Sequence, residues 1–159
     1  MDTDRTQTTL RIERIAEGKD DYLPLLLVGD ESAEMIRRYI DCGNLYVGFV
    51  GDSAVAVCVT VDLNDDTVEV KNLAVREDFR RRGIGRKMLR HVEEISAGRT
   101  VTLGTGESPS NLRFYSACGY RYSHRVADFF TDNYPEPIIE EGIQLRDMIY
   151  LSKRISDAL

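Results

Sequence analysis

A short segment near the middle of the chain concentrates positive charge and glycine, a combination suited to binding phosphate. It consists of Arg80, Arg81, Arg82, Gly83, Ile84, Gly85 and Arg86, and it stands directly before the strongest predicted helix. The first N–H groups of a helix lack partners within the helix, and the helix dipole favours an anion there. Because glycine has no side chain, backbone donors at Gly83 and Gly85 can approach a phosphate closely. The segment predicts a pyrophosphate cradle, with a solvated basic helix start as the alternative.

The spacing of these glycines excludes two common nucleotide-binding motifs. The dinucleotide fingerprint needs a third glycine at a place where this chain has none, and the P-loop needs a Gly-Lys-Ser/Thr run that is missing. A basic nucleic-acid patch is a third interpretation, but the chain has a formal net charge of -6 and no basic stripe elsewhere. Binding to a long polyanion needs clustered Lys and Arg, so we expect no nucleic-acid partner.

The strand predicted just before this segment, Thr67–Val75, has an irregular hydrophobic pattern. Val68 and Val70 share one face by the period of two, whereas Leu73 and Val75 have the opposite parity. One extra residue between the two pairs would bring all four to the same side, which is a β-bulge. A bulge leaves backbone N–H and C=O groups unpaired, and these can bind an extended ligand that carries amides. A strand with both faces buried is the alternative.

The remaining pattern predicts the elements that must hold this strand and loop in place. Strands are predicted at 8–16, 44–50, 54–63, 99–104, 120–130 and 145–155. Helices are predicted at 31–40, 82–95 and 109–118, preceded by a first helix that carries 25–28 and ends at Gly29. Asp20 and Asp21 are expected to cap the first of these helices, and Ser108 is expected to cap the last one. Ile95 is expected to lie on the apolar face of the helix at 82–95. Residues 131–142 are expected to form a loop. The order of elements indicates a mixed α/β fold with one central sheet.

Length and composition limit the class of protein. A chain of 159 residues with 42% hydrophobic and 30% charged residues is typical of one globular domain, here 1–159. Cys42, Cys58 and Cys118 are an odd number without C-x-x-C spacing, which argues against a disulfide framework and against a zinc ribbon. The N-terminus has no apolar run, and no stretch approaches the ~18 apolar residues of a membrane span. We therefore expect a cytoplasmic protein without a membrane partner.

Three segments together resemble motifs of the GNAT N-acetyltransferase superfamily. Arg80–Gly85 resembles its [Q/R]-x-x-G-x-[G/A] acetyl-CoA loop, Val70–Val75 is similar to its bulged fourth strand, and Asn111–Tyr120 is similar to its N…[F/Y]-Y-x-x-x-G-[F/Y] segment. The order of the predicted elements also matches over nearly the whole chain. The resemblance implies a GNAT-like α/β (α+β) fold, with a mixed, mostly antiparallel sheet of about six to seven strands, about four flanking helices and a bulged fourth strand.

The resemblance also implies acetyl-CoA as the acyl donor and assigns parts of the chain to it. Leu73, Ala74 and Val75 would pair their backbone with the pantetheine arm, where one N–H group could polarise the thioester carbonyl. The residues from Arg80 to Arg86 would hold the pyrophosphate, and Asn111 would contact the pantetheine. No metal is expected.

Acetyl transfer to an amine needs a base and an acid, and the chain has candidates for both. A lysine-like amine has a pKa of ~10.4, so it must lose a proton before it attacks the thioester. The resemblance places Tyr115 near the sulfur, where a phenol with a pKa of about 10 suits protonation of the departing thiolate; a core aromatic is the alternative. Glu69 matches a position where some family members carry a catalytic glutamate, acting directly or through water. An exposed charge paired with Lys71 is the alternative for Glu69, and His124 is a second candidate base.

Cys118 could form an acyl-enzyme, but activation of a thiol needs a nearby base or positive charge, and none is evident. We therefore expect a buried cysteine and direct transfer in a ternary complex.

Two alternatives remain open for the whole chain. A non-catalytic acyl-CoA sensor would keep the basic loop without needing Tyr115 or Glu69, and an enzyme of the same fold could use a different acyl-CoA.

The acceptor is expected to contact the first two helices and the 131–142 segment, both of which are acidic. The acids are Asp20, Asp21, Asp30, Glu31 and Glu34 in the first region, and Asp132, Glu136, Glu140 and Glu141 in the second. A small cationic amine would suit them, although a solvated acidic surface explains the same residues, and a peptide amine is an alternative acceptor. Exposed sheet edges often pair in homodimers, so a homodimer is a further expectation.

Overall fold

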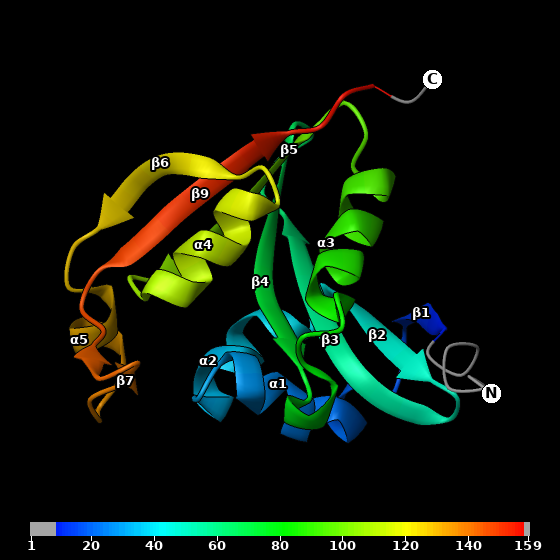
Figure 1. The fold of residues 1–159 in the computed structure, drawn as a ribbon, viewed down its shortest axis with the longest axis horizontal. Coiled ribbons are helices and arrows are strands. Elements are labelled where there is room, and N and C mark those ends of the chain that lie inside the picture. Colours follow the sequence, from blue (N-terminus) through cyan, green and yellow to red (C-terminus); the bar gives the residue numbers. More distant parts are fainter. Residues whose placement is uncertain (1–8, 158–159) are drawn as a thin grey trace. The chain divides into compact units, whose positions relative to one another are not determined.

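The structure is a computed structural model that describes residues 9–157. Within that range seven strands are hydrogen-bonded in the order β1-β2-β3-β4-β5-β9-β6, and β7 pairs with β8 separately (Figure 1). The pairs β1–β2, β2–β3, β5–β9 and β6–β9 are antiparallel, which confirms the expected mixed, mostly antiparallel α/β fold. Residue contacts divide the chain into two units. Unit 1 comprises 1–62 and 70–95, and unit 2 comprises 63–69 and 96–159.

Unit 1 begins with an antiparallel meander of three strands. β1 (Leu10–Ile15) pairs with β2 (Asn44–Val50), and β2 pairs with β3 (Ser53–Asp62). The turn between β2 and β3 contains Gly51, whose φ of 59° suits glycine better than any other residue. The inward side chains of β2 and β3 are fully buried; they include Leu45, Val47, Val55, Val57 and Val59.

Two short helices share a hydrophobic cluster with this meander. They are α1 (Leu23–Gly29) and α2 (Ala33–Ile40), and Leu26 and Ile36 are their most buried members. Ser32 caps α2 by accepting a hydrogen bond from the Met35 N–H at 3.1 Å.

The start of α1 differs from the sequence prediction. Asp20 and Asp21 lie in a 3₁₀ turn, Lys19–Tyr22, and α1 follows Tyr22 without a side-chain cap. Pro24 at the start of the helix has no N–H that needs a partner, so the helix can begin without the expected aspartate cap.

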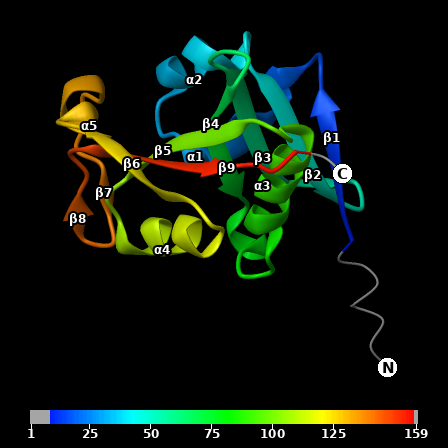
Figure 2. The same ribbon diagram turned by 90° about the horizontal axis from the view of Figure 1, so that it is seen from above.

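α3 (Ile84–Ile95) packs against β1 and β3 (Figure 2). Its buried face consists of Ile84, Met88, Leu89 and Val92. A Cβ on Gly48 of β2 would lie 3.0 Å from the Met88 sulfur, so the glycine allows this helix to approach the sheet closely. The expectation that Ile95 belongs to the buried face is wrong. Ile95 is 54% exposed because it is the last residue of α3, beyond the last buried turn.

β4 (Thr67–Val75) runs through both units. Residues 68–70 are buried in succession, after which buried and less buried residues alternate to the end of the strand. Val68, Val70, Asn72 and Ala74 are buried and keep one parity, so Leu73 and Val75 do not join the face of Val68 and Val70. The opposite face is buried only at Glu69, half-buried at Leu73 and Val75 and exposed at Lys71, and the bulge stays a prediction.

Unit 2 contains the strands at the other end of the sheet order. β5 (Thr100–Gly106) pairs with β9 (Met148–Arg154), and β9 pairs with β6 (Arg121–Val126), every residue of which is exposed. α4 (Pro109–Ala117) follows β5 and contacts it. Ser108 is the residue at the N-terminal cap position of α4, as predicted, and is extended, but its hydroxyl caps no helix N–H. Instead, the Ser108 Oγ is buried without a hydrogen-bond partner among the described residues.

The segment 131–142, expected as a loop, contains regular structure. α5 (Phe129–Asn133) covers its start, and β7 (Ile139–Glu140) and β8 (Ile143–Gln144) form a hairpin beside α5 (Figure 2). The two turn residues, Glu141 and Gly142, have φ values of 52° and 75°, as a tight two-residue hairpin turn requires. A Glu-Gly pair is a weak turn signal, so the sequence did not reveal the hairpin, and the flanking strands are shorter than predicted.

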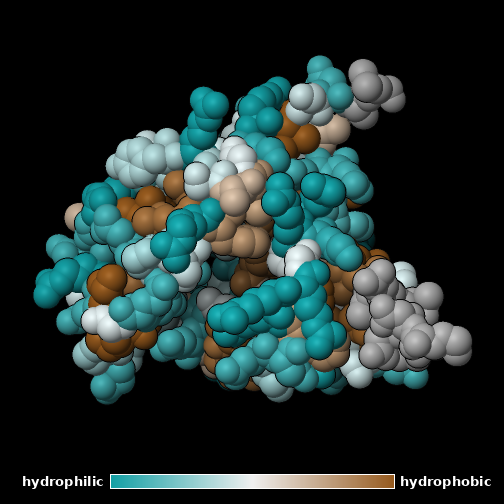
Figure 3. Space-filling view, in the orientation of Figure 1, coloured by the Kyte–Doolittle hydropathy of each residue, from teal (hydrophilic) through white to brown (hydrophobic). Residues whose placement is uncertain are grey.

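Exposed hydrophobic side chains of unit 2 occur on β6 and on the hairpin. Tyr122 and Val126 are 62% and 38% exposed, and Ile139 and Ile143 are 57% and 44% exposed. In Figure 3, hydrophobic side chains also emerge among hydrophilic ones where Figure 1 labels α5 and β7. Within residues 9–157, no helix combines the length and apolar character needed to cross a bilayer.

The burial of α3 generates a stability prediction. Leu89→Ala should lower the free energy of unfolding by about 2–5 kcal/mol, because it removes methyl groups from a fully buried site and leaves a cavity. Ile95→Ala, on the exposed end of the same helix, should change it by about 0.5 kcal/mol or less. Urea unfolding followed by circular dichroism measures both. Equal losses for the two variants would contradict the packing described for α3.

Candidate functional site

The basic loop lies in unit 1 between the end of β4 and the start of α3. A 3₁₀ turn, Glu77–Phe79, follows the strand, and then Arg81 and Gly83 adopt positive φ angles of 65° and 76°. The carbonyl of Gly83 accepts the Lys87 N–H at 3.1 Å, which begins the helical hydrogen bonding of α3. A Cβ on Gly83 would meet no atom within 4 Å, so the space above this glycine is open. The loop therefore leaves the start of α3 open at Gly83.

Arginine side chains in and just before the loop make specific contacts with neighbouring residues. Arg76 donates two hydrogen bonds to Asp78, at 2.7 and 3.0 Å, and Arg76 and Arg82 both lie over the Phe79 ring at 4.7 and 4.8 Å from its centroid. These contacts raise the pKa of Arg76, chiefly through the hydrogen bonds to Asp78, and lower the pKa of Asp78 for the same reason. The Arg80 Nε donates to the Val75 carbonyl at 3.3 Å. Arg76 and Arg82 are thus held by contacts with Asp78 and Phe79 of the 3₁₀ turn.

The strand segment expected to bind pantetheine belongs to the same unit as the loop. Ala74 is buried, whereas Leu73 and Val75 are half-buried. The Arg76 N–H, just after the strand, donates to the Val55 carbonyl of β3 at 2.7 Å. Unit 1 therefore brings together the sequence-predicted segments Leu73–Val75 and Arg80–Arg86.

Asn111 and Tyr115, the two residues of α4 that the sequence analysis assigned to the site, lie one helical turn apart in unit 2. Tyr115 is half-buried, and its ring packs edge-to-face against Phe114 and Tyr120, with centroids 5.0 and 6.2 Å apart. The Asn111 Nδ2 donates to the Thr105 Oγ1 at 3.2 Å and to a carboxylate oxygen of Glu140 at 3.4 Å. Residues four apart share one face of a helix, so the Asn111 and Tyr115 side chains leave α4 on the same side.

The hairpin places carboxylates at the start of α4. In addition to the Glu140 contact, the Ser110 N–H donates to Glu141 at 3.2 Å. Negative charge is favourable at a helix N-terminus, so the positions of both glutamates suit the dipole of α4. Two of the acids expected to attract a cationic acceptor are therefore engaged with α4.

Both candidate bases adjoin one tyrosine that the sequence did not single out. His124 of β6 pairs with Tyr150 of β9, and their rings stack in parallel with centroids 4.6 Å apart. Burial raises the pKa of Tyr150, and the charge of Glu69 raises it further. Glu69 itself is 7% exposed, so the alternative of an exposed strand charge is wrong. Gly104 pairs with Tyr150 from the other side, and a Cβ there would lie 3.0 Å from the Tyr150 ring, so small size at residue 104 makes room for the tyrosine.

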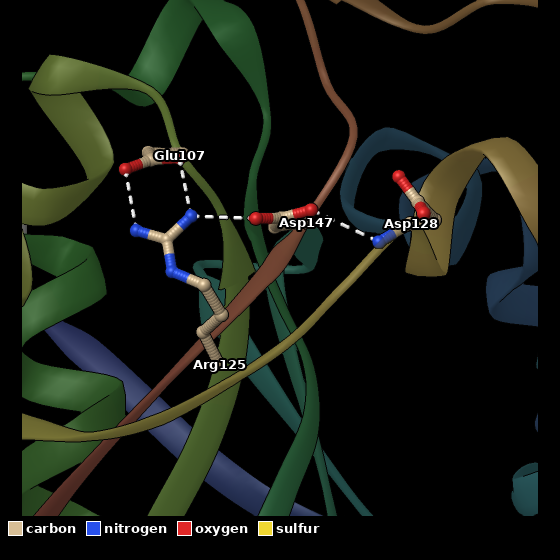
Figure 4. A network of polar contacts seen from close by, with 4 residues as sticks. All are labelled: Glu107, Arg125, Asp128 and Asp147. Atoms are coloured by element: carbon tan, nitrogen blue, oxygen red, sulfur yellow. Dashed lines mark hydrogen bonds and ion pairs between the residues drawn. The ribbon is translucent and has the colours of Figure 1, made fainter.

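An ionic network in unit 2 fastens the segment between β6 and β9 (Figure 4). The Arg125 guanidinium donates two hydrogen bonds to Glu107, at 3.1 and 2.9 Å, and one to Asp147 at 2.6 Å. The other oxygen of Asp147 accepts the Asp128 N–H at 2.9 Å. That N–H, together with Arg125, lowers the pKa of Asp147, and the two carboxylates raise the pKa of Arg125. The network joins residues far apart in the sequence, so no local pattern could reveal it.

Two of the three cysteines, Cys58 and Cys118, are buried. Cys58 is completely buried, which raises the pKa of its thiol to about 12, and Cys118 is 8% exposed at the end of α4. Within residues 9–157, no group of His, Cys, Asp and Glu side chains has the arrangement of a metal site. A thiol held mainly in its neutral form is a poor nucleophile.

Comparison with known proteins identifies the family of this chain. The model of the acetyltransferase (GNAT) domain family matches residues 41–122. The chain is 36% identical over 147 residues to the uncharacterized N-acetyltransferase YvbK of Bacillus subtilis, covering 89% of this chain and 94% of that protein. The chain therefore belongs to the GNAT superfamily and is an N-acetyltransferase.

Solved structures extend the match to nearly the whole fold. A GNAT family acetyltransferase from Elizabethkingia anophelis, with acetyl-CoA bound, is 34% identical, with a TM-score of 0.87 over 92% of this chain and 99% of that one. The IAA acetyltransferase from Bacillus cereus is 38% identical, with a TM-score of 0.84 over 92% of this chain and 99% of that one. These matches confirm the family resemblance that the sequence motifs indicated.

The lowered pKa of Asp147 generates a pH prediction. A carboxylate whose pKa is lowered by folding stabilises the protein above its ordinary pKa of 3.8, and that contribution is lost as the pH falls through the lowered value. Asp147→Asn should therefore melt about 1–3 °C below the wild type at pH 6, and the difference should shrink as the pH falls below 3.8 toward the lowered pKa.

Thermal unfolding between pH 2.5 and 7 checks this prediction. Asp66→Asn is the control, because Asp66 makes one exposed ion pair, to Arg154 at 2.9 Å, and fastens no comparable segment. A melting difference for Asp147→Asn that is the same at every pH would contradict the assigned role of the ionised carboxylate.

Proposed function

We propose that this protein transfers the acetyl group of acetyl-CoA directly to a primary amine of an acceptor. The observation that carries the proposal is the combination, within unit 1, of the Leu73–Val75 strand end and the basic glycine loop that opens α3. The similarity of this chain to a GNAT structure that contains acetyl-CoA supports acetyl-CoA as the donor. We further propose that residues 1–159 act as one catalytic domain, because β4 contributes residues to both units.

In this proposal, acetyl-CoA is held mainly by backbone groups. Leu73, Ala74 and Val75 pair with the amides of the pantetheine arm, and one of their N–H groups stabilises the oxyanion that forms on the thioester carbonyl. The open space above Gly83 admits the pyrophosphate to the first turn of α3, where backbone N–H groups and the helix dipole favour an anion. Arg80, Arg81, Arg82 and Arg86 are exposed around this point and supply the opposite charge.

The reaction forms one bond and breaks another. The amine nitrogen attacks the thioester carbon, an amide bond forms, and the carbon–sulfur bond breaks to release CoA. The proton lost by the amine goes to Glu69, directly or through water, and Tyr115 supplies a proton to the departing thiolate. The contacts of Tyr115 with Phe114 and Tyr120 support this role, because they fix the orientation of its ring. The buried Cys118 supports direct transfer rather than an acyl-enzyme.

The acceptor that we propose is a small cationic amine or a peptide amine. Glu140 and Glu141 are engaged with α4, and Asp30 accepts hydrogen bonds from Tyr39 and Ser32. The acids that remain to attract a cation are therefore fewer than the sequence indicated, with Asp132 and Glu136 in the segment after β6. The exposed edge strand β6 is the element that we propose for pairing in a homodimer.

A first prediction concerns Tyr115. In a thiol-release assay with acetyl-CoA and a panel of polyamines, aminoglycosides, amino acids and peptides, the wild type should release CoA with at least one amine. Tyr115→Phe should turn over at least tenfold more slowly while binding acetyl-CoA with unchanged affinity, because general-acid catalysis contributes about 10²–10⁴-fold. Tyr122→Phe, which removes an exposed phenol on β6, is the control and should keep the wild-type rate.

Wild-type turnover by Tyr115→Phe would remove Tyr115 from the mechanism. If the wild type binds acetyl-CoA tightly but releases no thiol with any acceptor, the result would favour the acyl-CoA sensor.

A second prediction concerns Gly83. Gly83 and Gly51 both have positive φ and open space where a Cβ would stand, so alanine should cost each site about 1–2 kcal/mol of backbone strain. Gly83→Ala should in addition weaken acetyl-CoA binding at least tenfold, because the new methyl group and the shifted backbone obstruct the pyrophosphate. Gly51→Ala, in the β2–β3 turn, is the matched control.

Calorimetric titration with acetyl-CoA, together with thermal unfolding, measures both effects of these glycine variants. Equal acetyl-CoA affinity in Gly83→Ala and Gly51→Ala would exclude the loop as the pyrophosphate site.

A further inference from the structure

The Asn72 side chain joins β4 to both short helices of unit 1. Asn72 is 4% exposed and directly precedes Leu73. Its Nδ2 donates to the Leu26 carbonyl in α1 at 2.9 Å and to the Tyr39 hydroxyl of α2 at 3.1 Å. Both N–H groups of the amide are therefore used, one on each helix.

The hydrogen bonding continues from Tyr39 into the linker between α1 and α2. The Tyr39 hydroxyl donates to the Asp30 Oδ2 at 3.2 Å, and the Asp30 Oδ1 accepts the Ser32 N–H at 3.2 Å. Burial raises the pKa of Tyr39 strongly, so the phenol keeps its proton and remains a donor to Asp30. One continuous set of bonds therefore leads from β4 to the start of α2.

The Asn72 carbonyl oxygen is enclosed and has no hydrogen-bond partner among the described residues. It lies against Gly29 at the end of α1, where a Cβ would come 2.2 Å from Oδ1 and 3.2 Å from the Ala74 Cβ. An unpaired buried oxygen opposes folding by an amount comparable with the gain from the two bonds of the Nδ2. The amide thus contributes little net stability, although it determines where both helices stand against β4.

We propose that Asn72 is a positioning residue that couples the acetyl-CoA strand to the helices of the acceptor side. This inference rests on the proposed function, which assigns Leu73–Val75 to the pantetheine arm and α1 and α2 to the acceptor. Pairing of the pantetheine with the strand immediately after Asn72 fixes the backbone that carries the amide. The fixed amide then holds Leu26, Tyr39 and, through Tyr39, the linker at Asp30. Acetyl-CoA binding therefore orders α1 and α2.

Amide hydrogen exchange tests this coupling without a known acceptor. In the wild type, saturating acetyl-CoA should slow exchange in residues 26–40 about fivefold or more, the lower end of typical coupling between two sites. In Asn72→Ala the same segment should show little change on binding, while acetyl-CoA still protects the Arg80–Arg86 loop. The control is Thr60→Val, which alters a buried polar residue on β3 and should keep the wild-type response.

Two further variants separate positioning from general stability. Gly29→Ala should abolish the ligand-induced protection by displacing the amide, and it should have little additional effect in the Asn72→Ala background, because both act through one contact. Asn72→Asp is isosteric, and its buried carboxyl group can donate one hydrogen bond only when protonated. The response of residues 26–40 in this variant should therefore return at pH 5 and be absent at pH 8.

The outcomes distinguish this inference from the proposed function. Equal protection of residues 26–40 in the wild type and in Asn72→Ala would overturn the positioning role while leaving acetyl-CoA binding intact. A response of Asn72→Asp that does not change between pH 5 and pH 8 would also count against it. Failure of the wild type to bind acetyl-CoA would overturn the proposed function and, with it, the inference that rests on it.

Discussion

The packing of α3 against the strands of unit 1 is the interaction on which the basic loop depends. Four buried side chains fix the axis of this helix, and Gly48 lets Met88 come close enough for the contact to form. Once the axis is fixed, the first turn of α3 and the open space at Gly83 have a fixed place at the end of β4. In the proposed function the dipole of α3 serves a phosphate, which requires that the helix keep its place, so packing in the core would contribute to that binding.

The sequence predicted those parts of the fold and site whose signals are local. β4 begins and ends at the expected residues, and α3 and α4 are recognisable from periodicity, Pro109 and the glycines after them. Features that depend on distant residues were not predictable. The bonds from Asn72 to Leu26 and Tyr39 span 46 and 33 residues, and the contacts of Arg125 join three separate segments. The hairpin at Glu141 was missed because its backbone conformation comes from context rather than from a strong turn pair.

The two units contribute different kinds of chemistry to the proposed reaction. Unit 1 offers backbone groups, a helix dipole and fixed cations, none of which changes charge at neutral pH. Unit 2 contains the groups that could exchange protons, namely Glu69, Tyr115 and the stacked pair His124 and Tyr150. The half-buried phenol of Tyr150 stays neutral, since its partial burial and the charge of the buried Glu69 both raise its pKa. In the proposed reaction, donor binding thus relies on backbone groups and permanent cations, and proton transfer relies on the side chains of Glu69 and Tyr115.

The fastening of residues 128–147 by Asp147 has a consequence for how such enzymes diversify. One carboxylate holds the Asp128 N–H at the beginning of the segment and Arg125 on β6, so the two ends are tied together at their base. Substitutions or changes of length between these ends need not disturb the pairing of β6 with β9. Under the proposed function, in which this segment contacts the acceptor, acceptor preference could drift during evolution while the donor-binding residues stay constant, and the segment is then the region to randomise when a new amine specificity is sought.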